Sequence, residues 1–151
     1  MSKLKLAQKV AMYAHKGQFD KAGVAYYHHP ETVASKVKTY KQKIVAYLHD
    51  VIEDSIITAD ILSIMGFPKD VVDAVVALTR QDNEKYKDYL ERVKSNKLAR
   101  IVKIADLEHN SDLTRLQKIT EQDIKRGVRY AIARNYLLGI ITEYNEQNFQ
   151  N

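Results

Sequence analysis

Apolar residues recur every three or four positions along most of the chain, which is the spacing of helices that bury one face. The clearest stripes lie in residues 3–16, 68–78 and 97–110, and no segment shows the sustained alternation of a half-buried strand. Only two prolines and five glycines occur in 151 residues, so strong turn formers are few. The sequence therefore predicts an all-α fold of helices joined by short loops.

Capping residues and prolines indicate where the helices begin. Thr58 and Asn83 are good N-caps, whereas Pro30 and Pro68 suit the first turn of a helix. Residues 17–28 are expected to form a loop after Gly17 ends the first helix. The expected helices are 3–16, one beginning at 29–30, 44–54, 58–65, one beginning at 68, 83 to about 94, 97–110, and about 121–144.

The length of 151 residues fits a single domain, which we expect to cover residues 1–151 with a core of about 3–140. The chain has no cysteine, which excludes thiol catalysis, disulfides, cysteine-based zinc sites and iron–sulfur clusters. Its apolar runs are far shorter than the ~18 residues of a membrane span. The first residues are amphipathic and offer no signal-peptide core. We expect a soluble, cytoplasmic protein with no membrane partner.

Charge is unevenly distributed along the sequence. Residues 1–48 hold nine lysines and two acids (+7), residues 49–91 four basic and ten acidic residues (−6), and residues 92–151 eleven basic and seven acidic residues (+4). This order suits a cation at an acidic centre and an anionic ligand at a basic rim, although the lysines can equally just solvate helix faces. No run of Lys or Arg exceeds two residues, which argues against nucleic-acid binding.

The segment 49–54, His-Asp-Val-Ile-Glu-Asp, is the first candidate for chemistry. It places an imidazole and three carboxylates directly after an apolar turn. Carboxylates spaced three or four residues apart on a helix repel one another, and partial burial raises their pKa values. A divalent cation removes that repulsion. The alternative is a solvated helix end whose acids only face water.

Two further residues strengthen the case for a metal. Asp106 directly follows an apolar stripe, and His29 stands at a predicted helix start, where Pro30 fixes the backbone. His28 is the alternative imidazole. Histidines and carboxylates from separate segments form a nitrogen and oxygen ligand set that suits Mn²⁺, Fe²⁺, Zn²⁺ or Mg²⁺. The His-Asp dipeptide alone is a weak signal.

Four stretches, residues 14–18, 26–30, 48–54 and 103–110, together resemble a known family. In this order they are similar to the HD-domain metal phosphohydrolases and, among these, to the RelA/SpoT-type (p)ppGpp hydrolase domain, including small stand-alone homologues. The strongest part is His-Asp-x-x-Glu-Asp followed by Ala-Asp-Leu-x-His-Asn. The resemblance spans roughly residues 3–140. Nothing similar to the synthetase or regulatory domains of the long proteins is present.

The resemblance implies a single-domain helical HD bundle with one metal site. Its ligands would be His29, His49, Asp50 and Asp106, and Mn²⁺ is the usual metal of this group. The implied reaction is hydrolysis of the 3′-pyrophosphate of ppGpp or pppGpp to GDP or GTP and pyrophosphate, as in the stringent response. The partner would be a small nucleotide, and no oligomeric state follows.

The resemblance also implies roles for residues around the metal. Glu53 and Asp54 match the acidic pair that activates the attacking water and handles its proton, and Lys21 and Asn110 match nucleotide contacts. One position departs from the pattern: Asp20 stands where the group has an arginine that packs on the guanine base. An acid cannot provide the same cation–π contact, so the base preference stays open.

Two other functions remain compatible with the sequence. The chain can be an HD-domain hydrolase of a different nucleotide or phosphoester, or a non-catalytic protein that binds a nucleotide or nucleic acid through its basic faces. Among the remaining candidates, His15 reads as structural and His109 as a surface residue or a support for the ligands. Tyr130, on the predicted last helix, is a weak candidate for a pocket.

Overall fold

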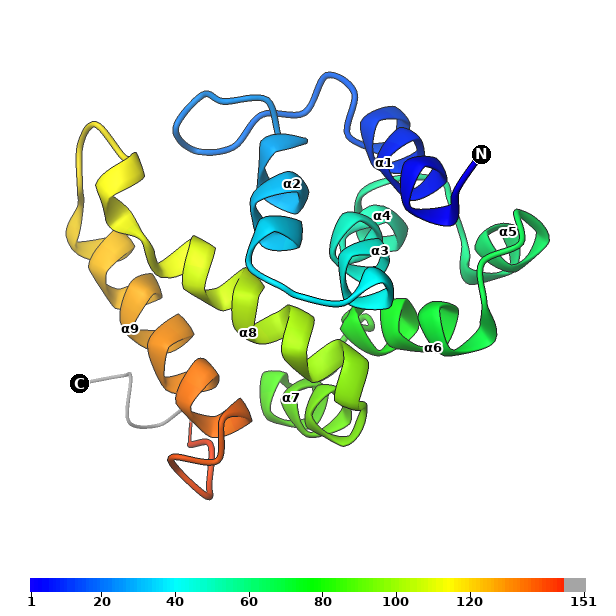
Figure 1. Ribbon diagram of the computed structural model, residues 1–151. Helices are drawn as coiled ribbons and strands as arrows, with labels where there is room; N and C mark the ends of the chain where they lie inside the picture. Colours follow the sequence, from blue (N-terminus) through cyan, green and yellow to red (C-terminus); the bar gives the residue numbers. More distant parts are fainter. Residues whose placement is uncertain (146–151) are drawn as a thin grey trace.

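The computed structural model describes residues 1–145, which form α-helices and one short 3-10 helix (Figure 1). Within these residues Phe19 and Ala25 form an isolated β-bridge and no strand is present, so the all-α prediction is confirmed. The end of the predicted domain, residues 146–151, lies outside the described part. In chain order the elements are α1 (Lys3–Ala14), α2 (His28–Ser35), α3 (Tyr40–Leu48), α4 (Val51–Asp54), α5 (Ala59–Ile64), α6 (Lys69–Leu78), α7 (Tyr86–Ser95), α8 (Lys97–Ser111), the 3-10 helix η1 (Leu113–Arg115) and α9 (Glu121–Leu137).

Two helices, α3 and α8, lie at the centre of the packing. Helix α3 contacts α1, α2, α6 and α8, while α8 contacts α2, α6, α7 and α9 along its length (Figure 1). Their buried faces meet apolar side chains of the surrounding helices, and removing these from water is the main stabilising contribution to the fold. The largest fully buried side chains include Ile44, Leu48, Leu62, Leu90, Leu107 and Leu137.

Local hydrogen bonds fix where several helices begin. Thr39 and Thr120 each accept an N–H from the third residue of their helix, whose own side chain accepts the N–H of the threonine, which completes a capping box. Thr58 caps α5, as predicted, and Asn96 caps α8. Each cap satisfies a backbone donor that the first turn leaves without a partner.

The predicted helix 44–54 is wrong in two respects: α3 begins earlier, at Tyr40, and the helix is interrupted at His49 and Asp50 between α3 and α4. The His49 Nδ1 lies 2.6 Å from the carbonyl oxygen of Ala46, which in a continuous helix would accept the N–H of Asp50. Asp50 has φ −105° and ψ 0°, outside the helical region. The side chain of His49 thus takes the place of a helical hydrogen bond and allows the turn.

Two other predicted boundaries are also wrong. Asn83 does not cap a helix: it has φ +60° in a turn, and α7 begins at Tyr86. Helix α9 ends at Leu137 rather than near Tyr144, because Gly139 takes φ +79° and Ile140 donates back to the Asn135 carbonyl at 2.9 Å. Glycine accepts this left-handed conformation without a steric penalty, which makes it an effective helix stop.

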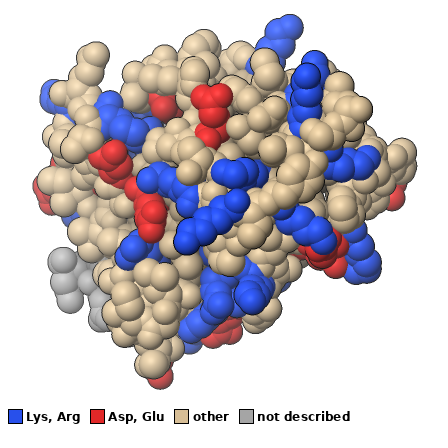
Figure 2. Space-filling model, viewed as in Figure 1, with Lys and Arg blue, Asp and Glu red and all other residues tan. Residues whose placement is uncertain are grey.

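The surface carries many basic side chains. Lysines and arginines spread across the face shown in Figure 2, with fewer acids between them.

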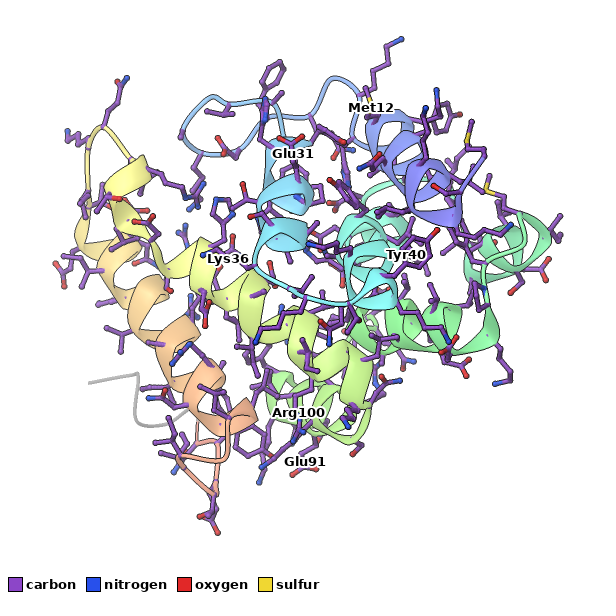
Figure 3. All side chains as sticks on the ribbon, viewed as in Figure 1. Met12, Glu31, Lys36, Tyr40, Glu91 and Arg100 are labelled. Atoms are coloured by element: carbon purple, nitrogen blue, oxygen red, sulfur yellow. The ribbon has the colours of Figure 1, made fainter. Side chains whose placement is uncertain are left out.

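Tyr40, labelled in Figure 3, lies on the outside beside α1, and its hydroxyl accepts the N–H of Leu4 at 3.1 Å. Among the described residues, no helix combines the length and apolar character that crossing a bilayer requires.

The cap of α9 predicts a stability effect. Thr120→Ala removes the hydroxyl that accepts the Asp123 N–H, so we expect a loss of about 1 kcal/mol of unfolding free energy, measured by urea denaturation. Thr120→Ser keeps the hydroxyl and is the matched control. Equal unfolding midpoints for the two variants would contradict the assignment of this cap.

Candidate metal centre

Four side chains from three parts of the chain converge between α2, α3 and α8. His29 lies in the first turn of α2, His49 follows α3, Asp50 precedes α4 and Asp106 lies on α8. The Nε2 atoms of the two histidines are 3.2 Å apart. Asp106 Oδ1 lies 2.8 Å from His29 Nε2 and 3.5 Å from His49 Nε2. Asp50 Oδ2 lies 3.0 Å from His49 Nε2 and 3.7 Å from His29 Nε2.

These separations suit a shared divalent ion. Ligand atoms bound at about 2.0–2.2 Å lie about 2.8–3.6 Å apart in octahedral or tetrahedral geometry, and the five distances above fall within or close to that range. The atoms of His29, His49 and Asp50 form a compact His-His-Asp group that can bind a divalent metal. Two imidazole nitrogens and carboxylate oxygens are the donors that first-row divalent ions prefer.

The charges of the cluster are held away from water. Both histidines and Asp106 are buried, and Asp50 is nearly so. Burial by itself lowers the pKa of His49, but the adjacent carboxylates of Asp50 and Asp106 raise it well above its usual value. Burial likewise raises the pKa of Asp50, and the charge of His49 brings it down to about 2. Positive charge, from protons or from a cation, is therefore what keeps these carboxylates ionised inside the protein.

The outer nitrogen of each histidine has its own partner. His49 Nδ1 bonds the Ala46 carbonyl, which fixes an N–H there and turns the Nε2 lone pair towards the cluster. His29 Nδ1 lies 2.7 Å from His109 Nδ1. Burial, together with the nearby charge of Arg115, lowers the pKa of His109 to about 4. A neutral His109 accepts the N–H of His29, which leaves the His29 Nε2 lone pair free for a metal.

The carboxylates are also anchored by neighbouring donors. The Tyr26 hydroxyl donates to Asp50 Oδ2 at 2.6 Å. Lys103 Nζ lies 2.8 Å from Asp106 Oδ2, and the Asn110 amide donates to Asp106 Oδ1 at 3.0 Å. Burial opposes the charge of Lys103, but the Asp106 carboxylate raises the lysine pKa well above its usual value. These contacts fix which carboxylate oxygens face the histidines.

Glu53 and Asp54 lie on α4, at the exposed edge of the cluster. Partial burial, reinforced for both residues by the charge of Asp50, raises their pKa values. Glu53 Oε1 accepts the backbone N–H of Arg80 at 2.6 Å. Asp54 Oδ2 lies 3.9 Å from the Nδ1 of buried His15. Both acids are therefore held beside the cluster, and their raised pKa values suit proton transfer.

A cavity of about 290 Å³ adjoins the cluster. Tyr26 and Asn110 line it and also bond Asp50 and Asp106, so the cavity and the cluster share a wall. Its other lining residues come from the α1–α2 loop, from η1 and from α9, which lie at the same end of the molecule in Figure 1. The two remaining candidates, Lys21 and Tyr130, both line this cavity.

The eight residues predicted as metal ligands, acidic catalysts and nucleotide contacts lie in or beside this region. The alternative histidine, His28, has a side chain that is 59% exposed and pairs with Glu31 outside the cluster. Sequence reasoning missed the supporting contacts of Tyr26 and Lys103, and it left the role of His109 open. For Lys103 a signal was present, since a lysine on the apolar face of a helix needs a buried acid.

Comparison with known proteins supports a relationship to SpoT. The chain is 32% identical over 125 residues to the bifunctional (p)ppGpp synthase/hydrolase SpoT of Escherichia coli K12, and equally to the guanosine-3′,5′-bis(diphosphate) 3′-pyrophosphohydrolase of Shigella flexneri. Each match covers 73% of this chain but only 18% of the relative, so the chain spans about a fifth of these proteins. No family model matches the sequence.

A solved structure carries the same fold over nearly the whole chain. It belongs to a metazoan ortholog of SpoT, described as hydrolysing ppGpp and acting in starvation responses. The TM-score is 0.73 at 21% identity, and the match covers 91% of this chain and 86% of the other. This chain shares the fold of that SpoT ortholog. Its all-helical HD fold is thereby confirmed.

The geometry of the cluster of His29, His49, Asp50 and Asp106 predicts stabilisation by metal. Mn²⁺ at about 100 times its Kd should add about 2.7 kcal/mol and raise the Tm by several degrees, because the folded state alone brings the ligands together. Asp106→Asn should lose this shift in a thermal melt. His28→Ala, which changes an exposed histidine next to His29, should keep it. An equal Mn²⁺ shift in the Asp106 variant would contradict the ligand set.

The contact between His109 and His29 predicts a further effect. His109→Ala removes the acceptor that orients the His29 ring, and we expect about 10- to 100-fold weaker Mn²⁺ binding in calorimetric titration. His109→Asn offers an amide oxygen as acceptor and should lose less. Unchanged affinity in His109→Ala would show that His29 needs no such support.

Proposed function

We propose that this chain is a metal-dependent phosphohydrolase that removes the 3′-pyrophosphate of ppGpp or pppGpp. The observation that carries the proposal is the convergence of His29, His49, Asp50 and Asp106 beside a cavity, where the two histidine Nε2 atoms lie 3.2 Å apart and each lies 2.8–3.7 Å from a carboxylate oxygen of both aspartates. We assign these four side chains as ligands of one divalent ion and infer Mn²⁺ as that ion. The names of the SpoT relatives support the substrate.

The chemistry asked of the site is attack by water on a phosphorus that already carries negative charge. A divalent ion held by the cluster would lower the pKa of water and would partly neutralise the charge of the phosphoryl oxygens. Glu53 has one carboxylate oxygen engaged by the Arg80 N–H, which orients the carboxylate, and we assign this residue as the acceptor of the water proton. Its raised pKa favours that task at neutral pH.

In the proposed reaction the oxygen of water bonds to the phosphorus attached to the 3′ oxygen of the ribose. The bond between that phosphorus and the 3′ oxygen breaks, which releases pyrophosphate. One proton passes from water to Glu53, and the 3′ oxygen takes up a proton to become a hydroxyl. Asp54, whose pKa is also raised, is the proposed donor of that proton. Lys21 and Asn110, which line the cavity, are proposed to contact the nucleotide.

Turnover of ppGpp with Mn²⁺ tests this function. Purified protein should release GDP and pyrophosphate in equal amounts, measured by anion-exchange chromatography. Glu53→Gln keeps an oxygen for the Arg80 N–H but cannot take a proton, so we expect kcat to fall about 10²- to 10⁴-fold.

The control for this assay is His28→Ala, which should retain wild-type turnover because His28 lies outside the cluster. Release of inorganic phosphate instead of pyrophosphate would favour a different phosphoester as substrate. Wild-type turnover in Asp106→Asn would contradict a role for the cluster in the reaction. Binding of nucleotide without turnover, unaffected by His49→Ala, would favour a non-catalytic binding protein.

A further inference from the structure

The cavity beside the cluster holds three acids and three basic residues, and their hydrogen bonds show which of them are available to a ligand. This step rests on the proposed function, because it concerns the nucleotide that function would use. The acids are Asp20, Asp112 and Asp123, and the basic residues are Lys21, Arg115 and Arg126. The volume of about 290 Å³ lies near the lower end of small-molecule pockets.

The three carboxylates are engaged in building the walls of the cavity. Asp20 Oδ1 accepts the N–H groups of Ala22 and Val24, which closes the α1–α2 loop. Asp112 accepts from the backbone and hydroxyl of Thr114 at the start of η1. Asp123 accepts the backbone N–H and the hydroxyl of Thr120 in the capping box of α9. Each carboxylate thus has one oxygen that accepts two hydrogen bonds from within the protein.

Among the basic residues, Arg126 Nη1 lies 3.7 Å from Asp123 Oδ1, whereas Arg115 has a buried donor that no described residue uses. Arg115 has one contact to an acid, from Nη1 to Asp20 Oδ2 at 3.4 Å, which is long for a hydrogen bond. Its Nε is buried and has no hydrogen-bond partner within the described residues. A buried donor without a partner is uncommon and is explained when a ligand supplies the acceptor. The cavity thus suits a ligand rich in acceptors.

We propose that Arg115 reads the acceptor edge of a guanine base, with Asp20 as the positioning residue that holds the guanidinium. Arginine bonds guanine O6 and N7 with two parallel donors, whereas adenine presents an amino donor in place of O6. The ring of Phe19, which is 68% exposed and lines the same cavity, offers a surface for stacking. The acid at position 20 and the cation at position 115 together form a polar wall.

Binding of GDP, IDP and ADP to the full chain in Mn²⁺, measured by calorimetry, tests this assignment. The three nucleotides share the diphosphate and ribose, so their differences report on the base. The wild type should bind GDP roughly 5- to 150-fold more tightly than ADP. IDP keeps O6 and N7 but lacks the 2-amino group, and it should bind like GDP. If IDP binds as weakly as ADP, Asp20 rather than Arg115 reads the base, and the proposal fails.

Variants separate base recognition from simple charge attraction. Arg115→Gln should remove the preference for GDP over ADP, whereas Arg126→Gln, which changes another arginine of the cavity, should leave the ratio unchanged. An equal loss of GDP and ADP affinity in Arg115→Gln would assign this residue to phosphate and overturn the proposal. Asp20→Asn keeps an oxygen for the loop N–H groups, so it should lower the GDP/ADP ratio without changing Tm.

The outcome is distinguishable from failure of the proposed function. A wild-type protein that hydrolyses ppGpp but binds GDP and ADP equally would retain the function and overturn the role of Arg115. A protein that prefers GDP, loses that preference in Arg115→Gln and yet never hydrolyses ppGpp would retain this inference and reject the function. The two measurements use different readouts, namely binding of a product nucleotide and release of pyrophosphate.

Discussion

Two imidazoles and two carboxylates held out of water at the junction of α2, α3 and α8 impose the strongest constraint on this structure. Ionised groups are costly to bury unless opposite charge and hydrogen bonds compensate them. Here the compensation comes from Lys103, Tyr26 and Asn110 on the carboxylate side and from a backbone carbonyl and His109 on the imidazole side. The packing of the central helices therefore also determines where the cluster forms, because the same helices supply apolar side chains to the core and charged groups to the cluster.

The break between α3 and α4 shows how the backbone serves this cluster. Successive side chains of a continuous helix point about 100° apart, so His49 and Asp50 could not both face the same point. The turn at Asp50 removes that restriction and brings His49 Nε2 and Asp50 Oδ2 to 3.0 Å. His49 itself bonds the carbonyl that the turn sets free. Two residues that are adjacent in sequence can therefore both reach the cluster, because α3 ends at Leu48, before them.

This break also marks the limit of what the sequence could predict. Apolar periodicity and caps such as Thr58 are local signals, and they located most helices correctly. The turn at His49 depends on a side-chain contact that competes with a helical hydrogen bond, and local pattern does not report such competition. Likewise, the sequence shows a lysine at position 103 and a histidine at position 109, but it does not show that helix packing places them against Asp106 and His29. Residue types and positions already suggested a nitrogen and oxygen ligand set, but they left a solvated helix end as an alternative, and the family resemblance then singled out His29, His49, Asp50 and Asp106.

The cluster and the cavity are built by different parts of the chain, so residue 20 in the cavity wall can differ without changing the residues proposed to carry out the chemistry. The cluster is built on central helices, whereas the cavity is closed by the α1–α2 loop, η1 and α9, which lie at the edge of the fold (Figure 1). Asp20 is on that loop and makes no contact with the four clustered residues; its bonds go to its own loop and to Arg115. An acidic side chain in place of a basic one at position 20 therefore alters the cavity wall that we propose to meet the base, and it leaves the donor atoms of His29, His49, Asp50 and Asp106 where they are. Tyr26 and Asn110 line the cavity and also bond carboxylates of the cluster, so substitutions there should affect both ligand selection and the cluster.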